Sequence, residues 1–194
     1  NFNTFDTGYY SKNIDKEKLE EQKLILAAKM DKMTMVLNRD TTMEYIRQIF
    51  EKDDSSKHAL FMIDVDNFKL LNDTYGHIVG DEFLIDFAAE LKSSFRESDI
   101  VGRVGGDEFF ALMRDVQDRD TIEMKARELL ETIQGVCKPY ADVNLSGSIG
   151  IAVYPESGKS IEALYLRADT ALYQAKREGK NKYIFFEKQQ EKMS

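Results

Sequence analysis

Residues 59–66 read Ala-Leu-Phe-Met-Ile-Asp-Val-Asp, a short apolar run with two acids at its end. An apolar run of this length is typical of a strand that is buried on both faces of a sheet. Because side chains alternate between the two faces of a strand, Asp64 and Asp66 lie on the same face. The run therefore predicts a central strand that brings two carboxylates to one end of a sheet.

The segments after this strand predict the rest of the fold. Apolar residues at every fourth position from 79 to 95 indicate an amphipathic helix. Two apolar runs, residues 100–104 and 109–113, flank the tight segment Gly-Gly-Asp-Glu and predict a hairpin. Further helices are expected near residues 121–136 and 160–177, and further strands near residues 143–153 and 183–186. This order favours an α+β fold, in which a central mixed or antiparallel five-stranded sheet is flanked by helices.

The first forty residues have a different character. Residues 1–13 are polar and without a period, whereas a helical pattern begins near Ile14. Its apolar stripe comprises Leu19, Leu26, Met30, Met33 and Leu37. A second helix is expected from Thr41 to the polar stretch at residues 52–57. We therefore expect a tail and linker helix over residues 1–30, one folded domain over residues 31–188 and a C-terminal tail over residues 189–194.

The composition limits the classes of function. With 194 residues, 42% of them apolar, the chain is long enough for one full-sized core. A net charge of −8 argues against broad nucleic-acid binding, but a small phosphate ligand fits if a divalent metal supplies positive charge. The single Cys137 cannot close a disulfide within the chain, and no apolar run reaches the length of a membrane span, so the cytoplasm is expected. Because the sequence begins with Asn1, we expect a fragment, which a membrane or sensor segment can precede in the parent protein.

Two acidic clusters stand where catalytic groups often lie, at a strand end and at a hairpin tip. Asp64 and Asp66 form the first cluster, and Asp107 and Glu108 form the second. If the strand and the hairpin are neighbours, four carboxylates converge, and such a group is tolerated mainly when Mg²⁺ binds it. The alternative is a surface hairpin with solvated acids. Neither the Gly-x-x-x-x-Gly-Lys-Ser/Thr loop nor Gly-x-Gly-x-x-Gly after a strand occurs, so other phosphate-binding routes are absent.

Residues 105–109, Gly-Gly-Asp-Glu-Phe, match the signature of the GGDEF family of diguanylate cyclases, and the chain resembles this family over residues 31 to about 186. Supporting segments occur in the family's order: Asp31-x-x-Thr34-x-x-x-Asn38-Arg39, Asp64-Val65-Asp66-Asn67-Phe68-Lys69, Asn72-Asp73-Thr74-Tyr75-Gly76-His77 with Gly80-Asp81, Ser148-Ile149-Gly150, Tyr154-Pro155, and the segment from Ala168 to Asn181. The resemblance implies a nucleotidyl cyclase or polymerase palm-like fold that condenses two GTP molecules into cyclic di-GMP and releases two pyrophosphates.

The resemblance also implies the roles of individual residues. The metal ligands, for two Mg²⁺ or Mn²⁺ ions in each half-site, are Asp64, the carbonyl of Val65, Asp107 and Glu108. Asp64, Asp107 and Glu108 are the catalytic acids, and Glu108 helps to deprotonate the attacking hydroxyl. The phosphate-binding positions are Lys176, Lys180 and the backbone N–H groups of Asn67, Phe68 and Lys69.

Asn72 and Asp81 match the guanine-binding positions of the family. A carboxylate can accept hydrogen bonds from guanine N1–H and N2–H₂, whereas adenine offers no such pair of donors. Asp81 is therefore expected to favour GTP over ATP.

The resemblance further implies three partners. Each domain holds one GTP and the product has two identical linkages, so a two-fold homodimer is the simplest catalytic unit. A sensor domain is expected upstream in the parent chain. Arg96-x-x-Asp99 matches the family's inhibitory site for cyclic di-GMP, and the alternative is an Arg96 that pairs only locally with Asp99.

Two other functions stay open. One is a receptor module that binds GTP or cyclic di-GMP without turnover, and the other is a related nucleotidyl cyclase that makes another product. The sequence also departs from the family pattern. Met35 and Val36 replace the usual Gly and Leu, Lys180 replaces a common Arg, and Asn67 replaces a frequent aromatic or apolar residue.

Overall fold

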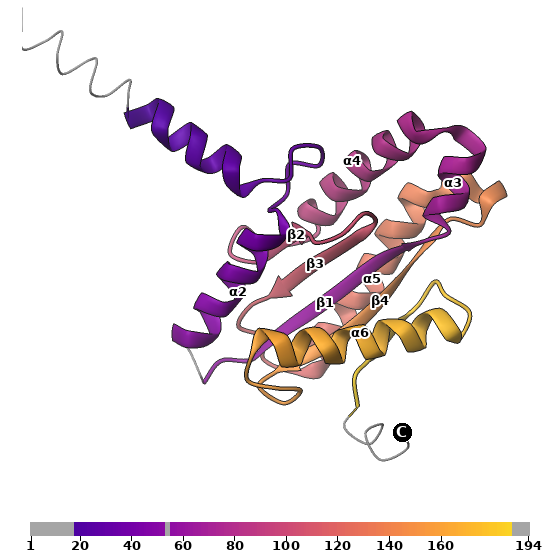
Figure 1. The fold of residues 1–194 in the computed structure, drawn as a ribbon. Helices are drawn as coiled ribbons and strands as arrows, with labels where there is room; N and C mark the ends of the chain where they lie inside the picture. The colour runs from indigo at the N-terminus through magenta and orange to yellow at the C-terminus, as the bar shows by residue number, and fades with distance from the viewer. Residues whose placement is uncertain (1–17, 53–54, 188–194) are drawn as a thin grey trace, which may run out of the picture.

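The computed structural model describes residues 18–52 and 55–187, which build a five-stranded sheet with helices on both faces (Figure 1). The strands are β1 (His58–Asp66), β2 (Ile100–Arg103), β3 (Glu108–Met113), β4 (Ser146–Tyr154) and β5 (Tyr183–Phe185). Their order is β2-β3-β1-β4-β5, with β1 antiparallel to β3 and β4, β2 antiparallel to β3, and β5 parallel to β4. The sheet is therefore mixed, and the predicted α+β architecture is confirmed.

Two pairs of helices cover the sheet. The helices are α2 (Arg39–Lys52), α3 (Phe68–Tyr75), α4 (His77–Ser93), α5 (Arg119–Cys137) and α6 (Ile161–Arg177), and a 3₁₀ helix (Lys138–Val143) follows α5. Helices α4 and α5 pack on one face, and α2 and α6 pack on the other (Figure 1). The short helix α3 lies in the segment that the sequence pattern left as a loop after the central strand.

The central strand β1 is buried along its whole length, as its apolar run predicts. Phe61, Ile63 and Val65 belong to the core beneath α4 and α5, whereas Leu60 and Met62 belong to the core beneath α2 and α6. By alternation, Asp64 and Asp66 follow Leu60 and Met62 onto the α6 face. The end of β1 therefore presents both carboxylates to α6.

The N-terminal helix ends earlier than the apolar stripe predicted. The structure describes it over residues 18–29, and it projects away from the sheet with Leu19 and Leu26 exposed (Figure 1). The Asp31 carboxylate then accepts hydrogen bonds from the backbone N–H of Thr34 at 2.9 Å and from its hydroxyl at 2.7 Å. Such side-chain hydrogen bonds compete with helix formation. The helix therefore does not continue to Leu37, and the helical pattern was wrong over residues 30–37.

Residues 35–38 form the connection to α2. Met35, which replaces the usual Gly, has φ 57°, the left-handed conformation that disfavours side chains with a Cβ. Leu37 pairs instead with Gly102 of β2. The side chain of Asn38 accepts a hydrogen bond from the backbone N–H of Thr41 at 3.0 Å and caps α2, which therefore begins before Thr41.

Several expectations lie outside the described residues: the tail over residues 1–13, the start of the helix near Ile14 and the C-terminal tail over residues 189–194. Among the helices that the structure describes, none has the length and apolar character needed to cross a membrane.

Gly150 allows α6 to approach β4 closely. A Cβ atom at this position would lie 2.0 Å from the carbonyl oxygen of Ala168 and 2.4 Å from the backbone nitrogen of Leu172, both in α6. Backbone atoms of a packed helix cannot move aside for a methyl group. The place of α6, and of every side chain that it presents to the end of β1, therefore depends on this glycine.

We predict opposite effects for the same substitution at two glycines. Gly150→Ala should lower the free energy of unfolding by about 3 kcal/mol, because it overpacks the contact between α6 and β4. Gly135→Ala in α5 should raise the free energy of unfolding by up to about 1 kcal/mol. A Cβ atom added at this position would have no neighbouring atom within 4 Å, and alanine favours a helix. Urea unfolding measures both changes, and an unchanged midpoint for Gly150→Ala would contradict this account of helix α6.

Candidate metal and nucleotide site

The hairpin tip lies beside the end of the central strand. Asp64 pairs with Glu108 in the register of β1 and β3, so their side chains share one face. The backbone N–H of Val65 donates a hydrogen bond to the carbonyl of Asp107 at 3.2 Å. The structure therefore brings together Asp64, Val65, Asp107 and Glu108, for which the resemblance implies metal binding.

Asp64 is the most perturbed acid of this group. Only 9% of its side chain is exposed, and the Lys176 Nζ atom lies 2.8 Å from its Oδ1 atom. Burial raises the pKa of Asp64 to about 6, the Lys176 ammonium acts in the opposite direction, and the charges of Asp107 and Asp66 add to the rise. A buried carboxylate among other acids needs a cation, which Lys176 supplies in this structure.

Asp66 serves the fold instead. Its carboxylate accepts hydrogen bonds from the hydroxyls of Ser146 at 2.8 Å and Ser148 at 2.9 Å, and from the backbone N–H of Asn181 at 3.3 Å. It is 2% exposed and joins β1 to β4 and to the turn after α6. The predicted convergence of four free carboxylates is therefore reduced to three, because these donors already satisfy Asp66.

The chemistry of the remaining donors fits a hard divalent cation. Carboxylate and carbonyl oxygens are the ligands that Mg²⁺ and Mn²⁺ prefer. Among the described residues, however, no three His, Cys, Asp or Glu side chains are already arranged around a metal position. The Lys176 ammonium occupies the place of a cation on Asp64. The acids therefore fit a metal, but the site is not preformed.

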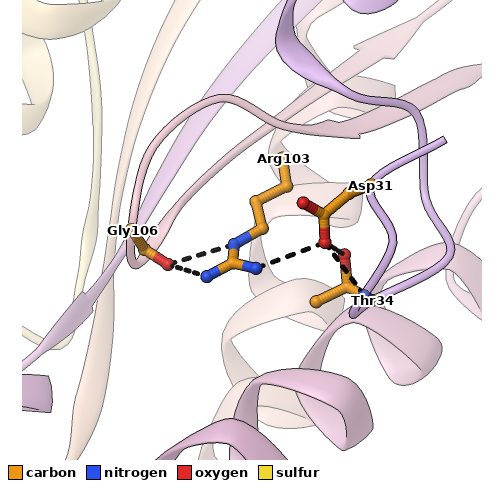
Figure 2. Close-up of polar contacts among 4 residues, drawn as sticks. All are labelled: Asp31, Thr34, Arg103 and Gly106. Atoms are coloured by element: carbon orange, nitrogen blue, oxygen red, sulfur yellow. Dashed lines mark hydrogen bonds and ion pairs between the residues drawn. The ribbon is translucent and has the colours of Figure 1, made fainter. Parts of the chain in front are cut away.

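Arg103 holds the hairpin tip in place (Figure 2). Its Nε and Nη2 atoms donate to the carbonyl of Gly106 at 3.1 and 2.6 Å, and its Nη1 atom lies 3.2 Å from Oδ1 of Asp31. Burial opposes ionisation of Asp31, but the hydrogen bonds from Thr34 and the charge of Arg103 hold its pKa below the usual value. One guanidinium thus connects the turn after the N-terminal helix to the candidate metal site.

Arg103 was missed in the sequence, although a signal exists. A charged residue at the end of an otherwise apolar strand, two positions before a glycine turn, is suited to bind the open carbonyls of that turn. Its other partner, Asp31, lies 72 positions away in the chain and has no spacing rule that connects the two.

The predicted guanine-binding residues lie on α3 and α4. Gly80 packs so closely on Asn72 that a Cβ atom there would lie 1.9 Å from the Asn72 Oδ1 atom. This Oδ1 atom is buried and has no hydrogen-bond partner in the structure, while the neighbouring Asp81 is exposed. An unsatisfied amide acceptor and an exposed carboxylate are groups that suit a ligand edge with several N–H donors.

The predicted phosphate-binding residues meet at the start of α3. Asn67 precedes this helix in a left-handed conformation, with φ 63°. Its side chain accepts a hydrogen bond from the Lys180 Nζ atom at 2.7 Å and donates one to the carbonyl of Asn144 at 2.8 Å. Phe68 packs against Phe83, and the backbone N–H groups of the first turn of α3 have no partner within the helix. Lys69 is exposed in that turn.

Arg96 and Asp99 lie in the connection between α4 and β2. The Asp99 carboxylate accepts hydrogen bonds from the backbone N–H of Arg96 at 3.1 Å and of Arg114 at 2.9 Å. The Arg96 side chain is exposed and, within the described part of the chain, makes no ion pair with Asp99. Asp99 also lines a cleft of about 500 Å³ between this connection and α2. The carboxylate therefore orders the turn, and the guanidinium points to solvent.

Comparisons with known proteins agree with this geometry. The family model described as "Diguanylate cyclase, GGDEF domain" matches residues 28–182. The bifunctional diguanylate cyclase/cyclic di-GMP phosphodiesterase MucR of Pseudomonas aeruginosa is 39% identical over 86% of this chain and 24% of its own length. The diguanylate cyclase DgcM of Escherichia coli is 37% identical over 89% of this chain and 42% of its own length.

The fold has a solved counterpart. The GGDEF domain of TpbB (YfiN) from Pseudomonas aeruginosa, solved as an N-terminally shortened mutant, superimposes with a TM-score of 0.76 at 29% identity and covers 84% of this chain and 98% of its own. The chain spans only a quarter to two fifths of the curated relatives MucR and DgcM. Since the family model matches most of the chain and the acids of its signature lie together at the end of the central strand, the chain belongs to the GGDEF family of diguanylate cyclase domains.

Proposed function

We propose that this domain condenses two GTP molecules into cyclic di-GMP and releases two pyrophosphates. The observation that carries the proposal is the meeting of Asp64 with Glu108 at the end of β1, beside Lys176. These acids suit metals, Lys176 beside them suits a phosphate, and Asn72, on the helix that follows β1, carries an acceptor that suits a base. Such an arrangement suits phosphoryl transfer, in which positioning and charge stabilisation provide most of the catalysis.

The chain's own residues would share the work as follows. Asp64, the Val65 carbonyl, Asp107 and Glu108 would hold two Mg²⁺ or Mn²⁺ ions, which lower the pKa of the ribose 3′-hydroxyl and neutralise charge on the α-phosphate when bound. Glu108 accepts the proton of this hydroxyl. The 3′-oxygen then forms a bond to the α-phosphorus, and the bond from that phosphorus to the pyrophosphate oxygen breaks.

The remaining contacts position GTP. The β- and γ-phosphates are bound by Lys176, Lys180 and the backbone N–H groups of residues 67–69, at the start of α3. Asn72 and Asp81 accept hydrogen bonds from the guanine edge. Each domain holds one GTP, so two domains must face each other in a homodimer to form both linkages.

The exposed apolar side chains of the N-terminal helix suit dimer formation. Leu19 and Leu26 are 51% and 61% exposed, and a parallel helix from a second chain would bury them. Because the chain spans 24% of MucR and 42% of DgcM, we propose that it is the cytoplasmic output module of a longer protein with an upstream sensor.

Product analysis tests this function. The purified chain is incubated with Mg²⁺ and GTP, and separately with ATP, at several protein concentrations, while light scattering reports the oligomeric state. Cyclic di-GMP from GTP alone, with specific activity that rises with concentration, is expected. GTP binding without product would favour a receptor module, and a different product would favour another nucleotidyl cyclase. Constant specific activity in a protein that stays monomeric would exclude the dimer.

The hairpin acids give the first functional prediction. Asp107→Ala and Glu108→Ala should abolish product formation, because both acids bind metal, and leave the melting temperature close to that of the parent, because neither packs in the core. A product assay and a thermal melt measure the two effects. Normal turnover in either variant would remove the metal assignment.

Asp81→Ser should relax the choice of base. Loss of the acceptor for guanine should cost about 1–3 kcal/mol, so the preference for GTP over ATP should fall roughly 5- to 150-fold. Asp86→Ser, an exposed acid on the same helix, is the control and should keep the preference. The measurement is the ratio of kcat/KM for GTP to kcat/KM for ATP in the parent and in both variants. If Asp81→Ser keeps the same ratio as Asp86→Ser, Asp81 does not read the base.

The exposed Arg96 side chain leads to a prediction about product binding. Its guanidinium can bind a phosphate or a guanine of cyclic di-GMP with two hydrogen bonds, and the cleft beside Asp99 leaves room for a ligand. Arg96→Ala should therefore abolish cyclic di-GMP binding in calorimetry, whereas Lys92→Ala, which removes an equal charge at the end of α4, should preserve it. Binding that persists in Arg96→Ala would mean that the product binds elsewhere.

A further inference from the structure

The two lysines assigned to phosphate binding have different partners in the structure. The Lys176 Nζ atom lies 2.8 Å from Oδ1 of Asp64. The Lys180 Nζ atom donates instead to Oδ1 of Asn67, an uncharged amide, at 2.7 Å. Only Lys176 therefore contacts an acid that the metals require.

The ammonium and a metal ion compete for the same carboxylate. The side chain of Asp64 is 9% exposed and that of Lys176 is 35% exposed. The carboxylate is therefore largely shielded from water, which strengthens its interaction with nearby charges. A divalent cation on Asp64 would meet the positive charge of Lys176 at close range, and the two cations repel each other. Metal binding to Asp64 thus requires Lys176 to move to another anion.

Among the described residues, the other acids that act on Asp64 offer Lys176 no equal alternative. Asp66 is already satisfied by Ser146, Ser148 and the backbone of Asn181. Asp107 and Glu108, which also face Asp64, are themselves candidate metal ligands. A triphosphate provides the missing anion, and lysine is a flexible point charge that can follow it.

We propose that Lys176 blocks the metal position on Asp64 until a nucleotide triphosphate draws it away. The proposal rests on the proposed function in one respect, since it takes the phosphates of GTP as the second partner of Lys176. Metal alone then binds weakly. Because coupling between two ligands is reciprocal, metal and triphosphate strengthen each other's binding. The domain thereby assembles its metal site only when substrate is present.

Mn²⁺ binding to the nucleotide-free domain tests this proposal without any turnover. Electron paramagnetic resonance or calorimetry measures the Mn²⁺ dissociation constant of the parent, Lys176→Met and Lys180→Met. Lys176→Met should bind Mn²⁺ roughly tenfold more tightly than the parent, the size expected for removing one charge-assisted hydrogen bond that competes with the ion. Lys180→Met should bind Mn²⁺ as the parent does, because Lys180 contacts an amide.

Both variants should bind a non-hydrolysable GTP analogue more weakly, because each loses a phosphate contact. Lys176→Gln provides a second neutral side chain if the methionine variant has a lowered melting temperature. Asp64→Asn should lose the tightening when combined with Lys176→Met, since the contested carboxylate is gone.

Two outcomes would overturn the proposal: Lys176 variants that bind Mn²⁺ no more tightly than the parent, or Lys180→Met that tightens binding equally, which would reflect general charge. The result is independent of cyclase activity. Tighter Mn²⁺ binding in a domain that makes no cyclic di-GMP would support the block by Lys176 while removing the proposed function. Cyclic di-GMP synthesis with unchanged Mn²⁺ affinity would do the reverse.

Discussion

The burial of Asp64 at the end of β1 is the constraint on which the rest of the site depends. A carboxylate that is withdrawn from water beside other acids is unstable without a cation, which its pKa of about 6 reflects. The neighbouring elements answer this need in two ways. Helix α6 supplies Lys176 as a cation for Asp64, and the Ser146 and Ser148 hydroxyls on β4 donate hydrogen bonds to the Asp66 carboxylate. Several acids can therefore lie together at the end of β1, although the chain has a net charge of −8.

The hairpin tip is held by a different kind of contact. Arg103 binds a carbonyl of the glycine turn on one side and Asp31 on the other, so the loop that carries Asp107 is tied to the turn after the N-terminal helix (Figure 2). A Cβ atom at Gly105 would lie 2.6 Å from the Oε2 atom of Glu108, so glycine there lets the turn lie close to this carboxylate. The Arg103 guanidinium in turn limits the conformational freedom of the glycine turn. The position of the N-terminal helix and the position of the acids thus depend on the same side chain.

In the proposed function, substrate recognition would be divided among several elements of the fold. Helices α3 and α4 present Asn72 and Asp81, whereas α6 and the turn after it present Lys176 and Lys180. Gly150 makes this possible, because it lets α6 lie directly on β4. In the proposed function, such a domain would bind the base with residues of α3 and α4 and the phosphates with residues of α6 and the turn after it.

The sequence by itself determined the elements whose signals are local. The apolar run at residues 59–66 predicted the buried central strand, the glycines before Asp107 predicted the hairpin, and the regular apolar spacing predicted α4, α5 and α6 to within a few residues. Only the tertiary structure decided the partners of the charged side chains. Asp31 finds Arg103 across 72 positions, Asp66 finds Ser148 across 82, and Lys180 finds Asn67 across 113. Hydrophobic periodicity is a property of neighbouring residues, whereas these contacts form only after the sheet has brought distant segments together, so no spacing in the chain encodes them.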